Sequence, residues 1–122
     1  MNKEEKQILL IDLSARYPYG VIIHSIWDYQ ELSGRIKRKE TVRTMESYDF
    51  CDYWNCKPYL RPLSSMTEEE KEELIKNFWG SHTAKDTFEE LSWYLSKHFD
   101  INGLIPKGLA IEVTEDNNPY KE

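Results

Sequence analysis

The segment CKPYLRPLSSMTEEEKEEL, residues 56–74, constrains the fold more than any other part of the chain. Its first half contains Pro58 and Pro62, which lack a backbone N–H and cannot continue a helix. A proline-bracketed stretch of this kind is tolerated in an edge strand or in a polyproline-like segment. The sequence therefore predicts an extended arm over residues 56–63 that closes a sheet and directs the chain into a helix.

The start of that helix comes directly after the arm. Thr67 and Glu70 have the spacing of a capping box, in which the Thr67 hydroxyl accepts from the N–H of Glu70 and the Glu70 carboxylate accepts from the N–H of Thr67. Three consecutive glutamates lie in the first turn, where the helix dipole favours negative charge. We therefore expect a helix over residues 68–79, with Gly80 as its stop.

Apolar periodicity predicts the remaining elements. Helices are expected over residues 3–15 and 84–98, the second with Thr83 as its N-cap, and a β-branched, aromatic strand over residues 21–29. One long strand or two short ones are expected over 35–48, a strand or tight turn over 48–54, and a short terminal strand over 109–113.

The predicted fold class is α+β, with an N-terminal helix, a small antiparallel sheet, two C-terminal helices and a short terminal strand. Short strands joined by tight turns can also close into a barrel, so a barrel-like sheet is an alternative. We expect a single domain over residues 1–122, with residues 114–122 as a flexible tail.

Charge and hydropathy narrow the classes of function. The net charge of −6 argues against general affinity for nucleic acids or anionic membranes. The longest purely apolar run, residues 8–11, is far shorter than the roughly 20 residues that span a bilayer. The polar, acidic start of the chain is unlike a signal peptide. We therefore expect a cytoplasmic protein that does not associate with membranes.

The sequence shows no convincing metal, cofactor or catalytic motif. Cys51 and Cys56 have C-x4-C spacing, but the histidines are scattered, whereas structural zinc sites use four closely spaced Cys or His ligands. Free thiols, no metal and no cofactor are expected. His98 and Asp100 are the best available candidates for an unrecognised enzyme, but no nucleophile or phosphate-binding motif accompanies them. We therefore assign no catalytic residues.

A basic stretch is the main candidate for a binding surface. Residues 35–43 hold five basic side chains and one acidic side chain, and an aromatic-rich stretch, residues 48–59, comes after them. If residues 35–43 form a strand, the alternation of side chains places Arg35, Lys37, Lys39 and Arg43 on one face. Basic strands beside aromatic rings occur in proteins that bind single-stranded nucleic acids. The alternative is a solvated face of a sheet whose neighbouring rings belong to the core. The candidate surface comprises Arg35, Lys37, Lys39, Arg43, Tyr53 and Trp54.

Three segments in a fixed order resemble a known family. Residues 56–71, 93–110 and 16–21, about a third of the chain, are similar to segments of small uncharacterised proteins from gut-bacterial phages, prophages and mobile elements. The resemblance implies an intracellular accessory protein of a mobile element. It implies no catalytic residue.

The sequence supports three functional hypotheses. The first is a non-catalytic protein-interaction or accessory module that binds a protein partner or itself, because Tyr and Trp are enriched at interfaces. The two halves of the chain also differ in charge, with a net of +1 for residues 1–63 and −7 for residues 64–122. The second is a nucleic-acid-binding accessory factor that uses the basic strand over 35–43. The third is an unrecognised enzyme.

Overall fold

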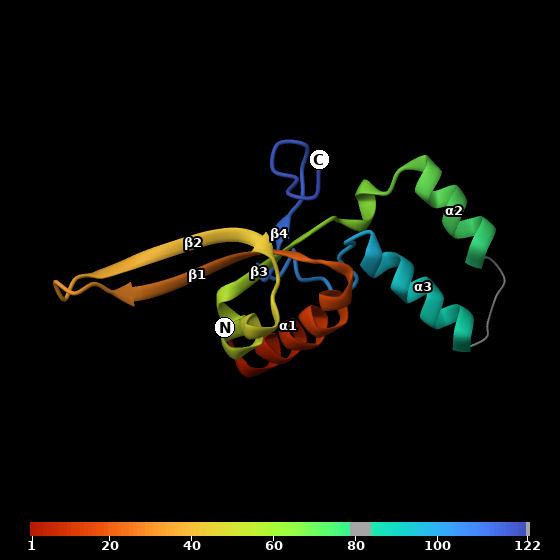
Figure 1. Cartoon of the computed structure of the whole chain (residues 1–122). Coiled ribbons are helices and arrows are strands. Elements are labelled where there is room, and N and C mark those ends of the chain that lie inside the picture. The colour runs from red at the N-terminus through yellow and green to blue at the C-terminus, as the bar shows by residue number, and fades with distance from the viewer. Residues whose placement is uncertain (79–83, 122) are drawn as a thin grey trace.

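The computed structural model describes residues 1–78 and 84–121 (Figure 1). The α+β fold class is confirmed. The helices and strands are α1 (Lys3–Arg16), β1 (Ile22–Gln30), β2 (Ile36–Thr44), β3 (Cys56–Leu60), α2 (Glu68–Phe78), α3 (Ala84–Ser96) and β4 (Ile111–Glu112). The 3₁₀ segments are η1 (Tyr17–Tyr19), η2 (Ser47–Asn55) and η3 (Leu63–Ser65).

The four strands form one curled, mixed sheet in the order β2-β1-β3-β4. Strand β1 is antiparallel to both of its neighbours, whereas β4 runs parallel to β3. The expectation that the proline-bracketed arm forms an edge strand or a polyproline-like segment is therefore wrong, because β3 lies between β1 and β4. Strand β1 pairs with Cys56–Pro58, whereas β4 pairs only with Tyr59 and Leu60. The strand accommodates Pro58 because β4 does not pair with this residue and so needs no backbone N–H from it.

The main core lies between α1 and the sheet. Leu9 and Leu13 on one face of α1 are fully buried, together with Val21, Ile23 and Leu60 of the sheet region. Apolar burial of this kind is the main stabilising contribution to a domain of this size. The core therefore covers only the end of the sheet nearest α1.

A buried polar network ties α1 to the segment after α3. The Nε atom of Arg16 donates to Oδ1 of Asp12 at 2.6 Å, and Nη2 of Arg16 donates to the carbonyl oxygen of Phe99 at 2.6 Å. Asn102 donates to Oδ2 of Asp12 at 2.8 Å. Both charged side chains are fully buried, so removal of either one would leave an unpaired charge in the interior.

The helix start after the arm has the predicted capping box. The Thr67 N–H donates to Glu70 Oε1 at 3.0 Å, and the Glu70 N–H donates to Thr67 Oγ1 at 3.1 Å. Helix α2 is described from Glu68 to Phe78. The predicted stop at Gly80 and the predicted N-cap at Thr83 lie outside the described residues.

Two further segments bear on the expectations. Of the two alternatives for residues 48–54, a strand or a tight turn, the strand is not formed, because residues 47–55 form the 3₁₀ segment η2. The expected flexible tail is instead anchored through Tyr120, whose hydroxyl donates to the carbonyl oxygen of Tyr59 at 2.8 Å and accepts from the N–H of Ile22 at 2.9 Å. Its ring stacks on His98 with the ring centroids 3.7 Å apart. These contacts bring the chain end back over the start of β1.

Two projections leave the core in opposite directions (Figure 1). One is the antiparallel ribbon of β1 and β2, and the other is the pair of helices α2 and α3. Ile23 and Ser25, in the first half of β1, are buried, whereas Trp27 and the residues after it are exposed. The distal half of the ribbon therefore extends beyond the core.

Candidate functional site

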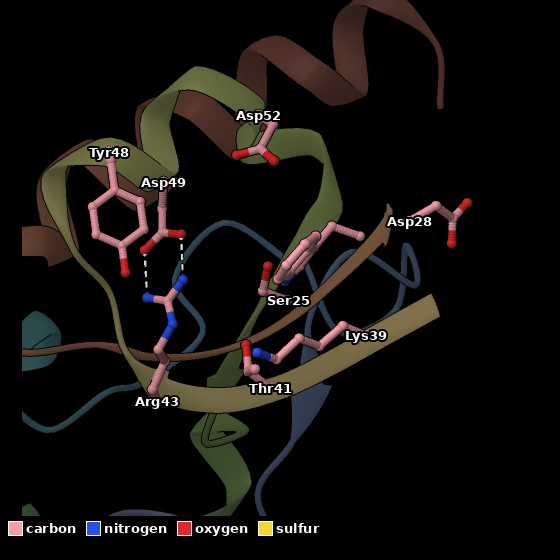
Figure 2. Close-up of a pocket in the computed structure, with 9 residues that line it drawn as sticks. Ser25, Asp28, Lys39, Thr41, Arg43, Tyr48, Asp49 and Asp52 are labelled. Carbon is pink, nitrogen blue, oxygen red and sulfur yellow. Dashed lines mark hydrogen bonds and ion pairs between the residues drawn. The ribbon is translucent and has the colours of Figure 1, made fainter. Parts of the chain in front are cut away.

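An open cleft lies where the β1–β2 ribbon leaves the core, between the ribbon and η2 (Figure 2). Its volume is about 460 Å³. It is lined by Ser25, Trp27, Asp28, Lys39, Thr41, Arg43, Tyr48, Asp49 and Asp52. The ribbon supplies one wall and η2 supplies the other, so the cleft continues outward into one face of the ribbon.

The strand register explains which side chains share that face. Trp27 is opposite Lys39, and Tyr29 is opposite Lys37, so rings from β1 lie beside cations from β2. The ring centroids of Trp27 and Tyr29 are 5.6 Å apart, and Lys39 Nζ lies 5.4 Å from the centroid of the Trp27 ring. We call these four residues the ribbon platform.

Most of the cations on β2 already have carboxylate partners. Two guanidinium nitrogens of Arg43 donate to the two carboxylate oxygens of Asp49, each at 2.7 Å (Figure 2). Lys37 Nζ lies 2.9 Å from a Glu31 oxygen. Arg38, on the opposite face, lies 3.4 Å from Asp28. Within residues 1–78 and 84–121, Arg35 and Lys39 are the basic residues of this stretch without an ion pair.

The Arg43–Asp49 pair is the electrostatic centre of the cleft. The hydrogen bonds that Arg43 donates to the Asp49 carboxylate raise the pKa of Arg43, so the guanidinium stays charged. Burial acts to raise the pKa of Asp49, but hydrogen bonds from Arg43 and from the N–H of Glu46 outweigh it and hold that pKa below its usual value. The pair thus anchors η2 to β2, and Arg43 is not free to track a phosphate backbone.

The six residues of the predicted surface do not form one site. Lys37 and Lys39 lie on the platform face, Arg43 is held by Asp49, and Arg35 directly precedes β2. Tyr53 packs against the core, half-buried, and Trp54 faces α1 with Lys6 Nζ 5.4 Å from its ring centroid. Neither ring lines the cleft.

The rings that do accompany the cations are Trp27 and Tyr29, which sequence reasoning missed. Both lie in the predicted strand over 21–29, two positions apart, so they share a face. The Ser33-Gly34 turn signal could have revealed them, because folding the chain back at that turn places them opposite Lys39 and Lys37.

His98 and Asp100 have separate structural roles. The Asp100 carboxylate accepts from the backbone N–H groups of Leu104 at 2.9 Å and Ile105 at 3.0 Å. His98 has a left-handed backbone, with φ of 64°, and stacks on Tyr120. Burial lowers the pKa of His98 to about 4, with further lowering from the positive charges of Arg16 and Arg61. In the described parts of the chain, no hydrogen bond or ion pair joins the His98 and Asp100 side chains.

The cysteines differ from each other in environment. Cys51 is exposed and Cys56 is buried, and both are free. Burial raises the pKa of Cys56 to about 11, which disfavours the reactive thiolate. The described residues contain no cluster of three or more His, Cys, Asp or Glu side chains suited to holding a metal ion. Nor does any helix among them combine the length and apolar character needed to cross a membrane.

The chain matches no protein-family model, no curated protein and no solved structure.

Proposed function

We propose that this protein is a non-catalytic interaction module whose contact element is the projecting part of the β1–β2 ribbon. One observation supports this most strongly: the ribbon has exposed apolar side chains on both faces. Trp27 and Tyr29 are exposed on the platform face, and Ile36 and Val42, 71% and 52% exposed, lie on the other. A two-stranded ribbon without core support is marginally stable in water, and a partner that covers these side chains would stabilise it.

The charge distribution favours a protein partner over a nucleic acid. Arg43, Lys37 and Arg38 are already paired with carboxylates, which reduces the positive potential available to phosphates. Asp52 also lines the cleft, where its carboxylate would repel a phosphate backbone. Exposed Tyr and Trp side chains such as those of the ribbon are instead enriched at protein interfaces.

Photo-crosslinking in the native host tests this proposal. A benzophenone amino acid in place of Tyr29 samples the ribbon, and the same replacement of Tyr17 is a control of matched residue type and exposure, at 40% and 37%. We expect protein adducts from position 29 and none from position 17. Equal labelling at both positions, or none at position 29, would overturn the proposal.

A second candidate function is binding of single-stranded nucleic acid, which the ribbon platform favours. Adjacent rings beside Lys39 resemble the stacking surfaces on which such proteins hold bases. Fluorescence anisotropy with oligonucleotides distinguishes the two functions. We expect nothing tighter than the roughly 10⁻⁴–10⁻⁶ M of non-specific contacts. Submicromolar binding at physiological salt, abolished when Arg35, Lys37 and Lys39 are replaced by Glu in a folded protein, would favour the second function.

The cellular setting is also a proposal. The similarity of residues 56–71 and 93–110 to proteins of gut-bacterial phages and mobile elements supports an accessory role in the cytoplasm of a bacterial host. The neighbouring genes test this directly. Neighbours that belong to chromosomal housekeeping operons, with no integrase, structural or mobilisation genes nearby, would contradict it.

A further inference from the structure

Strand β2 is an outer edge of the sheet, because among the described residues β1 is its only neighbour in the strand order. The register determines which backbone groups point outward. The Glu31 N–H donates to the Arg35 carbonyl, and the Met45 N–H donates to the Val21 carbonyl, so odd-numbered residues of β2 bond to β1. The backbone N–H and C=O groups at the free edge then belong to Ile36, Arg38, Glu40, Val42 and Thr44.

The side chains of these edge residues form a self-complementary pattern. They lie on the face opposite the ribbon platform, in the order apolar, basic, acidic, apolar for Ile36, Arg38, Glu40 and Val42. Reversal of this order gives apolar, acidic, basic, apolar. An antiparallel copy of the same strand therefore sets Arg38 opposite Glu40, and Ile36 opposite Val42.

We propose that two copies of this protein pair through their β2 edges, antiparallel, with Arg38 of each copy opposite Glu40 of the other. This deepens the proposed function and rests on it, since the ribbon is the contact element in both. Four opposed residue pairs, each exchanging two bonds, would supply about eight backbone hydrogen bonds. The exposed apolar side chains Ile36 and Val42 would cover each other at both ends of the contact.

The charges select this register over its neighbours. Only shifts of two residues keep the free backbone groups opposite each other. A shift one way sets Glu40 opposite Glu40, and a shift the other way sets Arg38 opposite Arg38. Like charges directly opposite each other are destabilising, whereas the proposed register forms two opposite-charge pairs.

The platform face is compatible with this pairing. The two Lys39 residues would meet at the twofold axis, but each ammonium group lies over the Trp27 ring of β1, on the side away from the edge. Lys37 faces Thr41 of the other copy, and Arg35 faces Arg43, whose charge Asp49 already neutralises. Arg38 and Glu40 are largely exposed, so they can reach across the edge while keeping their contacts with β1.

Charge-reversal variants test the pairing in the full chain. Sedimentation velocity from micromolar to submillimolar concentration should show a monomer–dimer equilibrium for the unmodified protein. Arg38→Glu alone and Glu40→Arg alone should each weaken it at least about tenfold, because each creates two like-charge pairs. The double variant, with both charges reversed, should recover the homodimer.

A mixture of the two single variants gives the sharpest result. Arg38→Glu supplies two acidic residues and Glu40→Arg supplies two basic ones, so the mixture should form a heterodimer although neither variant forms a homodimer. Circular dichroism establishes that each variant is folded. A monomeric unmodified protein, single variants that dimerise normally, or a mixture that stays monomeric would overturn the inference. A monomer that still forms protein adducts from position 29 would overturn this inference alone and leave the proposed function standing.

Discussion

Replacement of Glu70 by Gln should destabilise the protein in a pH-dependent way. Glu70 joins the end of β3 to the start of α2 because Arg61 donates to its two oxygens at 2.7 and 2.8 Å. The Arg61 guanidinium also lies 4.2 Å from the centroid of the Phe99 ring. Gln keeps the shape of the side chain but removes the charge that makes these hydrogen bonds strong.

The magnitude can be worked from the Glu70 pKa, which the hydrogen bonds from Arg61 lower from 4.5 to about 2. A shift of this size corresponds to just over 3 kcal/mol as an upper value. Solvent reaches part of the ion pair, although the Glu70 side chain is only 13% exposed, so screening reduces the effect. We expect Glu70→Gln to lower the free energy of unfolding by about 2 kcal/mol at pH 7.

The pH dependence has a definite sign. Because the pKa of Glu70 is lower in the folded state, its stabilisation is fully present above pH 4.5 and is lost as the pH falls through about 2. Urea unfolding of both proteins at pH 7 and near pH 3 measures the difference, and less than half of it should remain at the lower pH. Glu68→Gln is a matched control in the same turn, 86% exposed, and should change stability by a few tenths of a kcal/mol. A Glu70→Gln difference that is absent at pH 7, or equal at both pH values, would mean that the charge of Glu70 does not supply this stabilisation.

Three further predictions concern stability and metal content. Thr67→Ala should cost about 1 kcal/mol, typical of a lost N-cap hydroxyl, and an unchanged denaturation midpoint would contradict it. Tyr120→Phe removes the hydroxyl that bridges Tyr59 and Ile22 and should cost about 1–2 kcal/mol in the same assay. No loss would mean that the hydrogen bonds of the Tyr120 hydroxyl do not contribute to stability. Elemental analysis of protein purified without chelator should find no tightly bound zinc, and one equivalent per chain would contradict this prediction.

Local features of the fold could be predicted from sequence because their partners are close in the chain. The capping box needs only Thr67 and Glu70, three residues apart, and it appears as expected. The terminal strand is expected over 109–113, but its parallel pairing with β3 and the docking of Tyr120 could not be predicted in the same way. Both depend on residues near the C-terminus meeting β3 and β1, and no local periodicity encodes which strand such a segment joins.

The candidate site could be predicted only in part, for a related reason. Alternation along a strand is local, so the shared face of Lys37 and Lys39 can be read from sequence. The pairing of Arg43 with Asp49 depends on η2 folding back over β2, and it neutralises a cation that otherwise counts toward a basic surface. The charge of a segment in sequence therefore overstated the charge that the folded protein presents.

Cysteine cross-linking tests whether the ribbon edge is a contact surface with a defined register. In the proposed dimer, Lys39 lies opposite Lys39 in a non-hydrogen-bonded pair, with the Cα atoms about 4.5 Å apart, within the range of a disulfide. The two Lys37 residues are offset from each other by four positions along the paired strands, which separates their Cα atoms by about 13 Å. Each is replaced singly by Cys in a background with Cys51→Ser, since Cys51 is the exposed native thiol. On mild oxidation, Lys39→Cys should form a covalent dimer and Lys37→Cys should stay monomeric. A monomeric Lys39→Cys, or cross-linking of both variants to the same extent, would contradict the account.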